Sequence, residues 1–376
     1  MSDRNHLIIA AAGTGGHVMP GLAVAEEMKK RGWTVSWIGT PVGMEGRLVG
    51  QRGIDFDALD FTGMRGKGLG HAIKGAFKLV KSCFKAKEIV DDRDGDVVFS
   101  TGGYIAVPAA FGARAEGKPL VMMNCDAGSL MSVRVVMPVA SAVMCGFDGE
   151  CAQRAGKKAI VSGNPVREEI LHLPKPSERY AGRTGRQHVL VFGGSLGAKV
   201  LNDTVPRALA LFDESTRPTV THQCGKNAVE SVKETYRSLG IEAEVVSFID
   251  DMASAYEKAD LVVCRAGATT VSELTAGGIP AILVPFVVST TQHQLGNAQY
   301  LQAHDAGILL EQKHLTAENL YNQLRSLDRE RLLSMAQNAQ KLGHLDAAKT
   351  VADTIERLAK LGDNGSSHFS VKTTQN

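Results

Sequence analysis

Residues 7–16 read Leu-Ile-Ile-Ala-Ala-Ala-Gly-Thr-Gly-Gly, and residues 188–197 read His-Val-Leu-Val-Phe-Gly-Gly-Ser-Leu-Gly. Each stretch is a short apolar run that ends in glycines and leads into an amphipathic segment. A buried strand, a tight turn and a helix follow one another in this order in the βα units of parallel sheets. The occurrence of the pattern in both halves of the chain predicts two such sheets.

The alternation of short apolar runs and longer amphipathic segments continues along both halves, and 376 residues suffice for two domains. We therefore predict an α/β protein with two doubly wound, Rossmann-like parallel-sheet domains, at residues 1–166 and 167–344. A helix at about 345–361 is expected to pack back on the first domain, and residues 362–376 form a polar tail. The further predicted strands are Thr34–Ile38, Val97–Phe99, Leu120–Met123, Ala142–Met144, Thr219–Val220–Thr221, Glu244–Ser247, Leu261–Val263 and Ala281–Val284.

Composition excludes several classes of protein. With 42 basic and 40 acidic residues the formal net charge is +2, too balanced for a dedicated nucleic-acid binder. The six cysteines contain no Cys-x-x-Cys pair, which favours buried thiols in a reducing compartment. No uninterrupted apolar run reaches the roughly 18 residues of a membrane span. We expect a soluble cytoplasmic protein that can still touch a membrane surface.

Gly13, Gly15 and Gly16 stand between the first predicted strand and a helix, where backbone amides and the helix dipole favour an anion such as a phosphate. A dinucleotide-binding fingerprint would need glycine at Val18 and an acidic residue at the end of the second strand, where Gly39-Thr40 stand. A P-loop motif does not occur either. The pattern thus indicates a ligand with phosphates but disfavours dehydrogenases and P-loop nucleotidases.

The second half repeats this arrangement with Ser195, whose hydroxyl would donate to a phosphate oxygen. Glu273 is expected one to two turns into the helix after Leu261–Val263, where its carboxylate would accept two ribose hydroxyls. For each residue alone, a helix-capping serine or a solvated helical glutamate is an equally good interpretation.

At these residues the chain resembles the bacterial undecaprenyldiphospho-muramoylpentapeptide β-N-acetylglucosaminyltransferases of glycosyltransferase family 28. The resemblance implies the GT-B architecture, in which two Rossmann-like domains face a deep cleft. The matching segments, in order, are Gly13–Pro20, Gly63–Gly68, Gly102–Tyr104 with Pro108, Gly163–Arg167, Gly193–Gly197, Phe248–Met252, Arg265–Glu273 and His293–Ala298.

The resemblance implies transfer of GlcNAc from UDP-GlcNAc to the 4-hydroxyl of the muramoyl sugar of a lipid-linked pentapeptide precursor (lipid I to lipid II), with inversion at the anomeric carbon. No Asp-x-Asp stands where a metal-nucleotide site would be expected, so we predict no cofactor and no metal. The UDP-GlcNAc site implied by the resemblance consists of Thr14, Gly15, Gly16, Asp126, Arg167, Ser195, Ile249, Ala268, Thr269, Thr270, Val271, Ser272, Glu273 and Gln294.

His17 is the candidate general base, because its position beside the glycine turn and its ordinary pKa of about 6.5 suit proton transfer. A histidine that only caps the helix or binds the donor is the alternative. Relatives commonly carry His-Glu-Gln-Asn where Met123-Asn124-Cys125-Asp126 stand here. Asp126 accepts but does not donate hydrogen bonds when ionised, so it either shares the role of base or reflects neutral drift in a repacked loop.

Seven basic residues and one acidic residue lie between Phe61 and Val90, and their spacing predicts an amphipathic basic helix. One interpretation is an apolar stripe packed on the sheet beside solvated lysines. The resemblance favours the other, a surface that docks on the anionic cytoplasmic face of the bacterial inner membrane, as a peripheral protein near other cell-wall synthesis proteins. The residues assigned to acceptor and membrane contact are Arg65, Lys67, Ile73, Lys74, Phe77, Lys78, Val80 and Lys81.

Three alternatives remain at this point. A UDP-sugar transferase acting on another lipid, such as diacylglycerol, would carry the same donor motifs. A UDP-GlcNAc 2-epimerase would share the architecture and the donor without needing a basic helix. A UDP-sugar-sensing scaffold would bind the donor without turnover.

Overall fold

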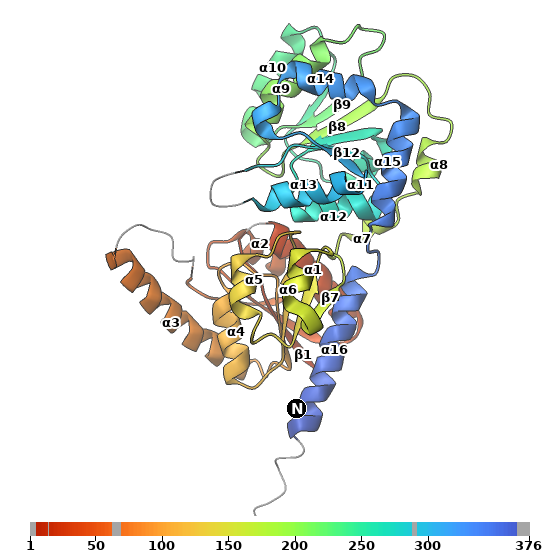
Figure 1. Ribbon diagram of the computed structural model, residues 1–376. Coiled ribbons are helices and arrows are strands. Elements are labelled where there is room, and N and C mark those ends of the chain that lie inside the picture. Colours follow the sequence, from red (N-terminus) through yellow and green to blue (C-terminus); the bar gives the residue numbers. More distant parts are fainter. Residues whose placement is uncertain (1–4, 14, 62–68, 288–291, 367–376) are drawn as a thin grey trace, which may run out of the picture. The chain divides into compact units, whose positions relative to one another are not determined.

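The computed structural model describes residues 5–13, 15–61, 69–287 and 292–366, and the side chains of residues 69–74 and 362–366 are outside that description. Two compact units form the chain: residues 1–166 with 346–376 make unit 1, and residues 167–345 make unit 2. Each unit is an α/β sandwich around one parallel sheet (Figure 1).

Unit 1 contains a parallel sheet in the order β3-β2-β1-β4-β5-β6-β7. The central strand β1 pairs with β2 on one side and with β4 on the other, so that Leu7 lies opposite both Val35 and Val97. The strand order reverses between β1 and β4, and this switch point is where doubly wound sheets bind ligands. The strands are β1 (His6–Ala10), β2 (Thr34–Gly39), β3 (Asp55–Ala58), β4 (Val97–Ser100), β5 (Leu120–Asn124), β6 (Ala142–Cys145) and β7 (Ala159–Val161).

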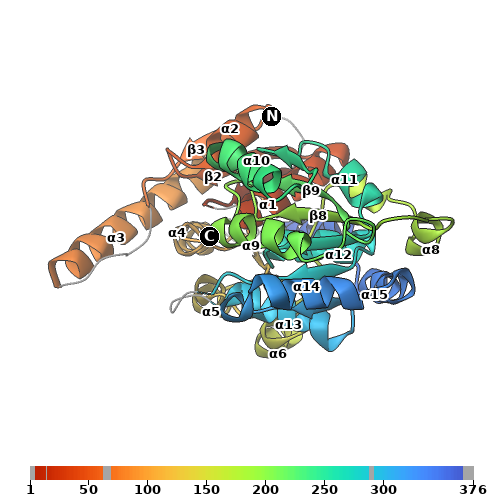
Figure 2. The same ribbon diagram turned by 90° about the horizontal axis from the view of Figure 1, so that it is seen from above.

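Helices cover both faces of this sheet, because its central strands are apolar on both sides: Leu7, Ile8 and Ile9 are all fully buried. Figures 1 and 2 both show α3 projecting from the body of the unit. The helices are α1 (Gly15–Lys30), α2 (Met44–Gly50), α3 (Leu69–Asp92), α4 (Ala106–Ala115), α5 (Met131–Val136), α6 (Glu150–Ala155), the 3₁₀ turn η1 (Gly156–Lys158) and α16 (Ala347–Ser366).

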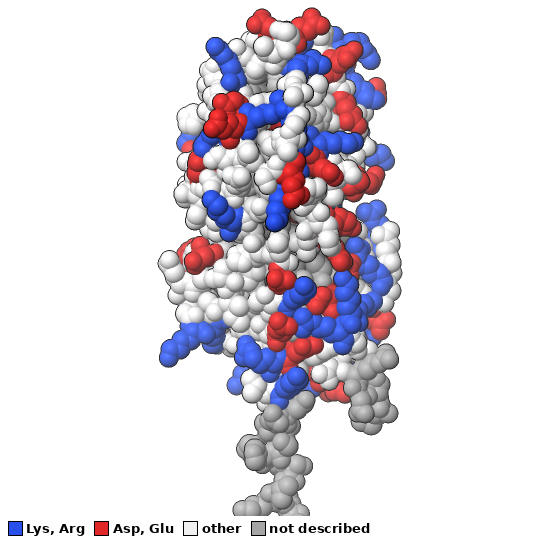
Figure 3. Space-filling model, turned by 90° about the vertical axis from the view of Figure 1, so that its right-hand side faces the viewer, with Lys and Arg blue, Asp and Glu red and all other residues white. Residues whose placement is uncertain are grey.

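The C-terminal helix α16 packs on α1, although more than 300 residues separate them in the chain. Val351 and Ile355 are buried, and Arg31, directly after α1, pairs with Asp353 at 2.6 Å and Glu356 at 3.1 Å. On the face shown in Figure 3, acidic and basic side chains are intermixed rather than gathered in one large patch of a single sign.

Unit 2 repeats the topology in the order β10-β9-β8-β11-β12-β13, with its switch point between β8 and β11. Figure 1 shows α9, α10 and α14 on one side of this sheet and α12 and α13 on the other. The strands are β8 (His188–Phe192), β9 (Thr219–Gln223), β10 (Glu244–Val246), β11 (Leu261–Cys264), β12 (Ala281–Leu283) and β13 (Gly307–Leu309). The helices are α7 (Glu168–Leu171), α8 (Pro176–Tyr180), α9 (Lys199–Ala210), η2 (Lys226–Ala228), α10 (Val229–Ser238), α11 (Met252–Lys258), α12 (Ala268–Gly277), α13 (His293–Ala303), η3 (Gln312–His314), α14 (Ala317–Ser326) and α15 (Arg329–Lys341).

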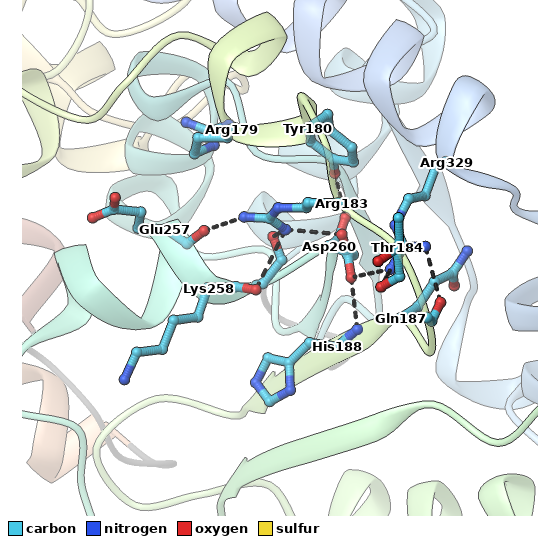
Figure 4. Close-up of polar contacts among 12 residues, drawn as sticks. Arg179, Tyr180, Arg183, Thr184, Gln187, His188, Glu257, Lys258, Asp260 and Arg329 are labelled. Atoms are coloured by element: carbon cyan, nitrogen blue, oxygen red, sulfur yellow. Dashed lines mark hydrogen bonds and ion pairs between the residues drawn. The ribbon is translucent and has the colours of Figure 1, made fainter.

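A buried carboxylate fixes the amino ends of β8 and β11. Asp260 accepts from the His188 backbone N–H at 2.8 Å and pairs with Arg183 at 2.8 Å and Arg329 at 3.4 Å (Figure 4). Its side chain is 3% exposed, and two guanidinium groups compensate for the cost of burying the charge. This cluster lies at the amino ends of these strands, whereas doubly wound sheets bind ligands at the carboxyl ends, so it serves the fold and not the ligand.

The predicted fold class is confirmed, since both sheets are parallel and doubly wound. Three described strands, β3, β7 and β13, were not predicted, and each lies at an edge of its sheet. An edge strand is half-exposed and needs no continuous apolar run; β3, for example, reads Asp-Phe-Asp-Ala and contains no fully buried residue. Its sequence therefore resembles a loop.

Candidate functional site

The switch point of unit 1 places His17 beside the end of β4. His17 lies in the first turn of α1, which begins at Gly15. Its Nδ1 is 2.9 Å from the carbonyl oxygen of Thr101. A carbonyl only accepts, so Nδ1 carries the proton and Nε2 is the basic nitrogen of the neutral ring. His17 is thus held in the tautomer in which Nε2 is the proton-accepting nitrogen.

Two consecutive glycines form the turn that lies beside this ring. Gly102 and Gly103 have φ of +96° and +79°, which side chains other than glycine rarely adopt. A Cβ atom on Gly102 would lie 3.6 Å from Cε1 of His17, and one on Gly103 would lie 3.2 Å from the carbonyl oxygen of Ala12. Glycine is therefore required in the β4–α4 turn beside His17 chiefly by the backbone conformation.

Asp126 lies in a loop that the preceding strand holds in shape. Asn124, the fully buried last residue of β5, donates through Nδ2 to the carbonyl oxygens of Asp126 at 2.6 Å and Gly128 at 3.1 Å. Its Oδ1 accepts from the N–H of Leu130 at 2.9 Å. Sequence reasoning missed this role of Asn124, although an amide inside an otherwise apolar strand was its visible signal.

In unit 2, the carboxyl end of β8 continues into a loop that exposes Ser195. The Gly197 N–H donates to the carbonyl oxygen of Gly194 at 2.8 Å, closing a tight turn around the serine. Gly194 and Gly197 have φ of +92° and +74°. The turn thus presents a hydroxyl and main-chain groups at the switch point, as an anion site requires.

Helix α12 begins at Ala268, directly after β11. Its N-cap residue, Gly267, has no side chain with which to cap the first-turn amides, so these donors and the positive end of the helix dipole are available to an anion. At the other end, the buried guanidinium of Arg179 donates to the carbonyl oxygens of Gly277 and Gly278. Thr269 and Thr270 lie in the first turn, followed by Val271, Ser272 and Glu273.

Glu273 is paired within unit 2. Its side chain is 5% exposed; Oε1 accepts from Arg167 at 2.9 Å (Nε) and 2.8 Å (Nη2), and Oε2 accepts from the Tyr256 hydroxyl at 3.2 Å. Burial raises the pKa of Glu273, while Arg167 acts in the opposite direction. The sequence predicted Arg167 and Glu273 as separate nucleotide contacts, but the structure joins them in one ion pair. It adds Tyr256, which the sequence analysis did not identify.

Two further predicted donor residues also lie in unit 2. Ile249 is half-buried in the loop between β10 and α11. Gln294, in the first turn of α13, accepts through Oε1 from the N–H of Phe286 at 2.8 Å. That bond fixes the amide so that Nε2 is its donor end. Thr14, Arg65 and Lys67 lie outside the described residues, as do the side chains of Ile73 and Lys74.

No cluster of three or more His, Cys, Asp or Glu side chains suited to a metal ion occurs among the described residues. The Asp-x-Asp of β3 is engaged elsewhere, because Arg93 pairs with Asp55 at 2.7 Å and with Asp57 at 2.9 Å. These carboxylates therefore stabilise the sheet edge.

The middle of α3 presents large apolar side chains to solvent: Phe77, Val80 and Phe84 are 73%, 54% and 61% exposed. Lys78 and Lys81 on the same stretch are also exposed. Near the body of the unit, the ring of Phe84 meets Phe111 of α4 edge to face at 5.9 Å. The interpretation in which this apolar stripe packs on the sheet is therefore wrong for Phe77, Val80 and Phe84. Within the described part of the chain, no helix is long and apolar enough to span a membrane.

Two doubly wound units, each with a glycine turn and a helix N-terminus at its switch point, define the GT-B fold. The chain matches the N-terminal domain of glycosyltransferase family 28 over residues 7–144 and the C-terminal domain of that family over residues 188–355. It therefore belongs to glycosyltransferase family 28, as the sequence indicated.

The chain is similar to two proteins named UDP-N-acetylglucosamine--N-acetylmuramyl-(pentapeptide) pyrophosphoryl-undecaprenol N-acetylglucosamine transferase. It is 49% identical to the one from Janthinobacterium sp. (strain Marseille), over 94% of this chain and 99% of that protein. It is 50% identical to the one from Methylibium petroleiphilum, over 95% and 98%. Among solved structures it resembles MurG of Acinetobacter baumannii, with a TM-score of 0.81 and 33% identity over 94% of this chain and 99% of that one.

Proposed function

We propose that this protein transfers GlcNAc from UDP-GlcNAc to the lipid-linked muramoyl-pentapeptide of peptidoglycan synthesis, forming lipid II. The observation that carries the proposal is near-half identity along almost the whole chain to relatives named for this reaction. Both switch points also carry the groups that the reaction needs: a base-competent histidine in unit 1 and anion-binding turns in unit 2.

The donor diphosphate binds at the α12 N-terminus and the Ser195 turn, whose amides and hydroxyl stabilise the charge on departing UDP. Glu273 meets the ribose hydroxyls through the lone pairs that Arg167 and Tyr256 leave unused, since each carboxylate oxygen accepts more than one hydrogen bond. Gln294 directs its Nε2 donor at a sugar hydroxyl. Ile249 offers main-chain groups to uracil.

His17 accepts the proton of the acceptor hydroxyl at Nε2, while the Thr101 carbonyl stabilises the imidazolium through Nδ1–H. His17→Ala is expected to lower kcat by about a hundredfold or more at saturating substrates, with a small change in KM for UDP-GlcNAc. Asp126→Asn is the companion variant, because it restores the amide usual in relatives. If His17→Ala turned over normally and Asp126→Asn did not, the base would be Asp126.

The α3 stripe docks on the cytoplasmic face of the bacterial membrane, where the acceptor lipid resides. Exposed Phe77, Val80 and Phe84 supply apolar contact and the lysines supply attraction to anionic headgroups. Each lysine near such a surface contributes about 1 kcal/mol, so charge reversal at Lys78 and Lys81 should weaken binding to phosphatidylglycerol vesicles by more than about thirtyfold.

Lys233→Glu with Lys349→Glu is a matched control, because it changes the net charge equally at exposed sites on other helices, α10 and α16. Equal loss of vesicle binding in both double variants would show a response to net charge alone and would contradict docking through α3.

Transfer to diacylglycerol and 2-epimerisation are the competing activities. Incubation with labelled UDP-GlcNAc and either acceptor lipid separates them. Label on the muramoyl-pentapeptide lipid supports the proposal, label on diacylglycerol identifies the other transferase, and loss of UDP-GlcNAc without acceptor identifies the epimerase. Binding of UDP-GlcNAc without any reaction would identify the protein as a UDP-sugar-sensing scaffold.

A further inference from the structure

A buried chain of polar side chains lies beneath the Ser195 turn of unit 2. His222, on β9, is fully buried, with Nδ1 2.9 Å from the Tyr236 hydroxyl of α10 and Nε2 3.1 Å from Oδ1 of Asn202 on α9. Asn202 in turn donates through Nδ2 to the carbonyl oxygen of Cys224 at 3.1 Å. Three secondary-structure elements are thus joined to one main-chain carbonyl.

The donors and acceptors along this hydrogen-bonded relay can be arranged in only one direction. Because the Asn202 amide nitrogen donates to a carbonyl, its oxygen accepts, and Nε2 of His222 must carry a proton. Nδ1 of His222 then accepts from the Tyr236 hydroxyl. Burial lowers the pKa of His222 to about 4, so the ring is neutral at pH 7, as this arrangement requires.

The carbonyl at the end of the chain forms the wall of the Ser195 turn. A Cβ atom on Gly197 would lie 1.9 Å from the Cys224 oxygen, and one on Gly225 would lie 2.2 Å from the Leu196 oxygen. The turn after β8 and the turn after β9 therefore touch backbone to backbone in both directions. A shift of Cys224 moves the surface on which Gly194–Gly197 rests.

We propose that His222 is a positioning residue for the sugar-nucleotide donor: by fixing the Asn202 amide it holds the Cys224 carbonyl, and with it the Ser195 turn, in the conformation that binds a donor phosphate. His222 itself does not touch the donor. This inference rests on the proposed function of the turn as part of the UDP-GlcNAc site.

His222→Leu removes both hydrogen bonds at similar volume and frees the Asn202 amide to rotate. We expect its KM and Kd for UDP-GlcNAc to rise about tenfold with kcat within about twofold, because the donor loses binding while the base and acceptor are untouched. His222→Gln should recover most of the affinity, since its Nε2 donor reaches Asn202. Tyr236→Phe, which deletes a single oxygen, should raise KM about twofold to threefold.

His188→Leu is the matched control. His188 is the first residue of β8, at the opposite end of the same sheet, with Nδ1 2.9 Å from the Thr219 hydroxyl. The His188→Leu variant should have a lower melting temperature. Its KM for UDP-GlcNAc should be unchanged when activity is measured well below that temperature. A purely structural role for His222 would give the same behaviour.

Two results would overturn the inference: a folded His222→Leu protein with wild-type KM, or an equal rise of KM in His188→Leu. If His222→Leu does not fold, the variants His222→Gln and Tyr236→Phe decide. A wild-type KM for UDP-GlcNAc in both of them would refute the positioning role. Absence of UDP-GlcNAc binding by the wild-type protein would instead refute the proposed function on which the inference rests.

Discussion

Acid should destabilise unit 2 through one residue more than any other, His222. Its pKa is about 4 in the folded protein and about 6.5 in the unfolded chain, because burial disfavours the charged ring. The unfolded state therefore binds more protons between these values, and stability falls as the pH drops below about 6.5. At pH 5 the unfolded histidine is almost fully protonated and the folded one is neutral, which lowers the free energy of unfolding by about 2 kcal/mol relative to pH 8.

The comparison of wild type with His222→Gln isolates this effect. Glutamine keeps the donor toward Asn202 and does not titrate, so the pH-dependent loss should be about 2 kcal/mol smaller in the variant. Other histidines whose pKa burial lowers, such as His188 and His344, are common to both proteins and cancel. Around His222, the pKa values of Tyr236 and Cys224 are raised by burial, so neither group titrates between pH 5 and 8.

Urea unfolding followed by tryptophan fluorescence and by far-UV circular dichroism provides the assay. Both tryptophans of the chain, Trp33 and Trp37, belong to unit 1, so their fluorescence follows that unit and serves as the internal control. Far-UV circular dichroism follows both units, and the transition without a fluorescence change belongs to unit 2. An equal loss of stability from pH 8 to pH 5 in wild type and His222→Gln would refute the assignment of a neutral buried histidine.

Three other substitutions test the packing around the proposed site. Gly197→Ala combines a φ of +74° with a Cβ 1.9 Å from the Cys224 oxygen, so steady-state kinetics should show a KM for UDP-GlcNAc raised at least about tenfold. Arg167→Leu leaves Glu273 buried without its cation and should destabilise unit 2 by about 3 kcal/mol in urea, whereas the double variant with Glu273→Gln should regain part of that loss. Trp37→Phe removes a buried indole hydrogen bond of 2.8 Å to a main-chain carbonyl and should lower the stability of unit 1 by about 1–2 kcal/mol while transfer activity is retained.

Local sequence patterns predicted the central strands, because a strand buried on both faces must be apolar throughout. Leu7–Ala10 and Val189–Phe192 are buried along their whole length and read that way in the sequence. Helix α1 begins at Gly15 and includes Pro20 in its second turn. Pro20 has no backbone N–H, so α1 lacks one hydrogen bond at this position.

Contacts between distant residues were beyond the sequence patterns. The pairing of Arg167 with Glu273 spans 106 positions and depends on α7 lying against α12. The hydrogen bond from His222 to Asn202 depends on the pairing of β8 with β9, which brings α9 over the second strand. Periodicity does predict that α3 is amphipathic, but only the structure shows that its apolar stripe is exposed.

In unit 2 a charged residue, Arg179, and a neutral hydrogen-bonded relay through His222 have different roles around the proposed donor site. At the C-terminus of α12, burial lowers the pKa of Arg179 to about 10, so the guanidinium is still charged at pH 7 and meets carbonyl oxygens at the negative end of the helix dipole. A positive group beneath the Ser195 turn would have to be desolvated without a counter-ion, and the relay through His222 avoids that cost by staying neutral. The α12 N-terminus thus attracts an anionic donor electrostatically, whereas the His222 relay fixes the backbone conformation of the Ser195 turn.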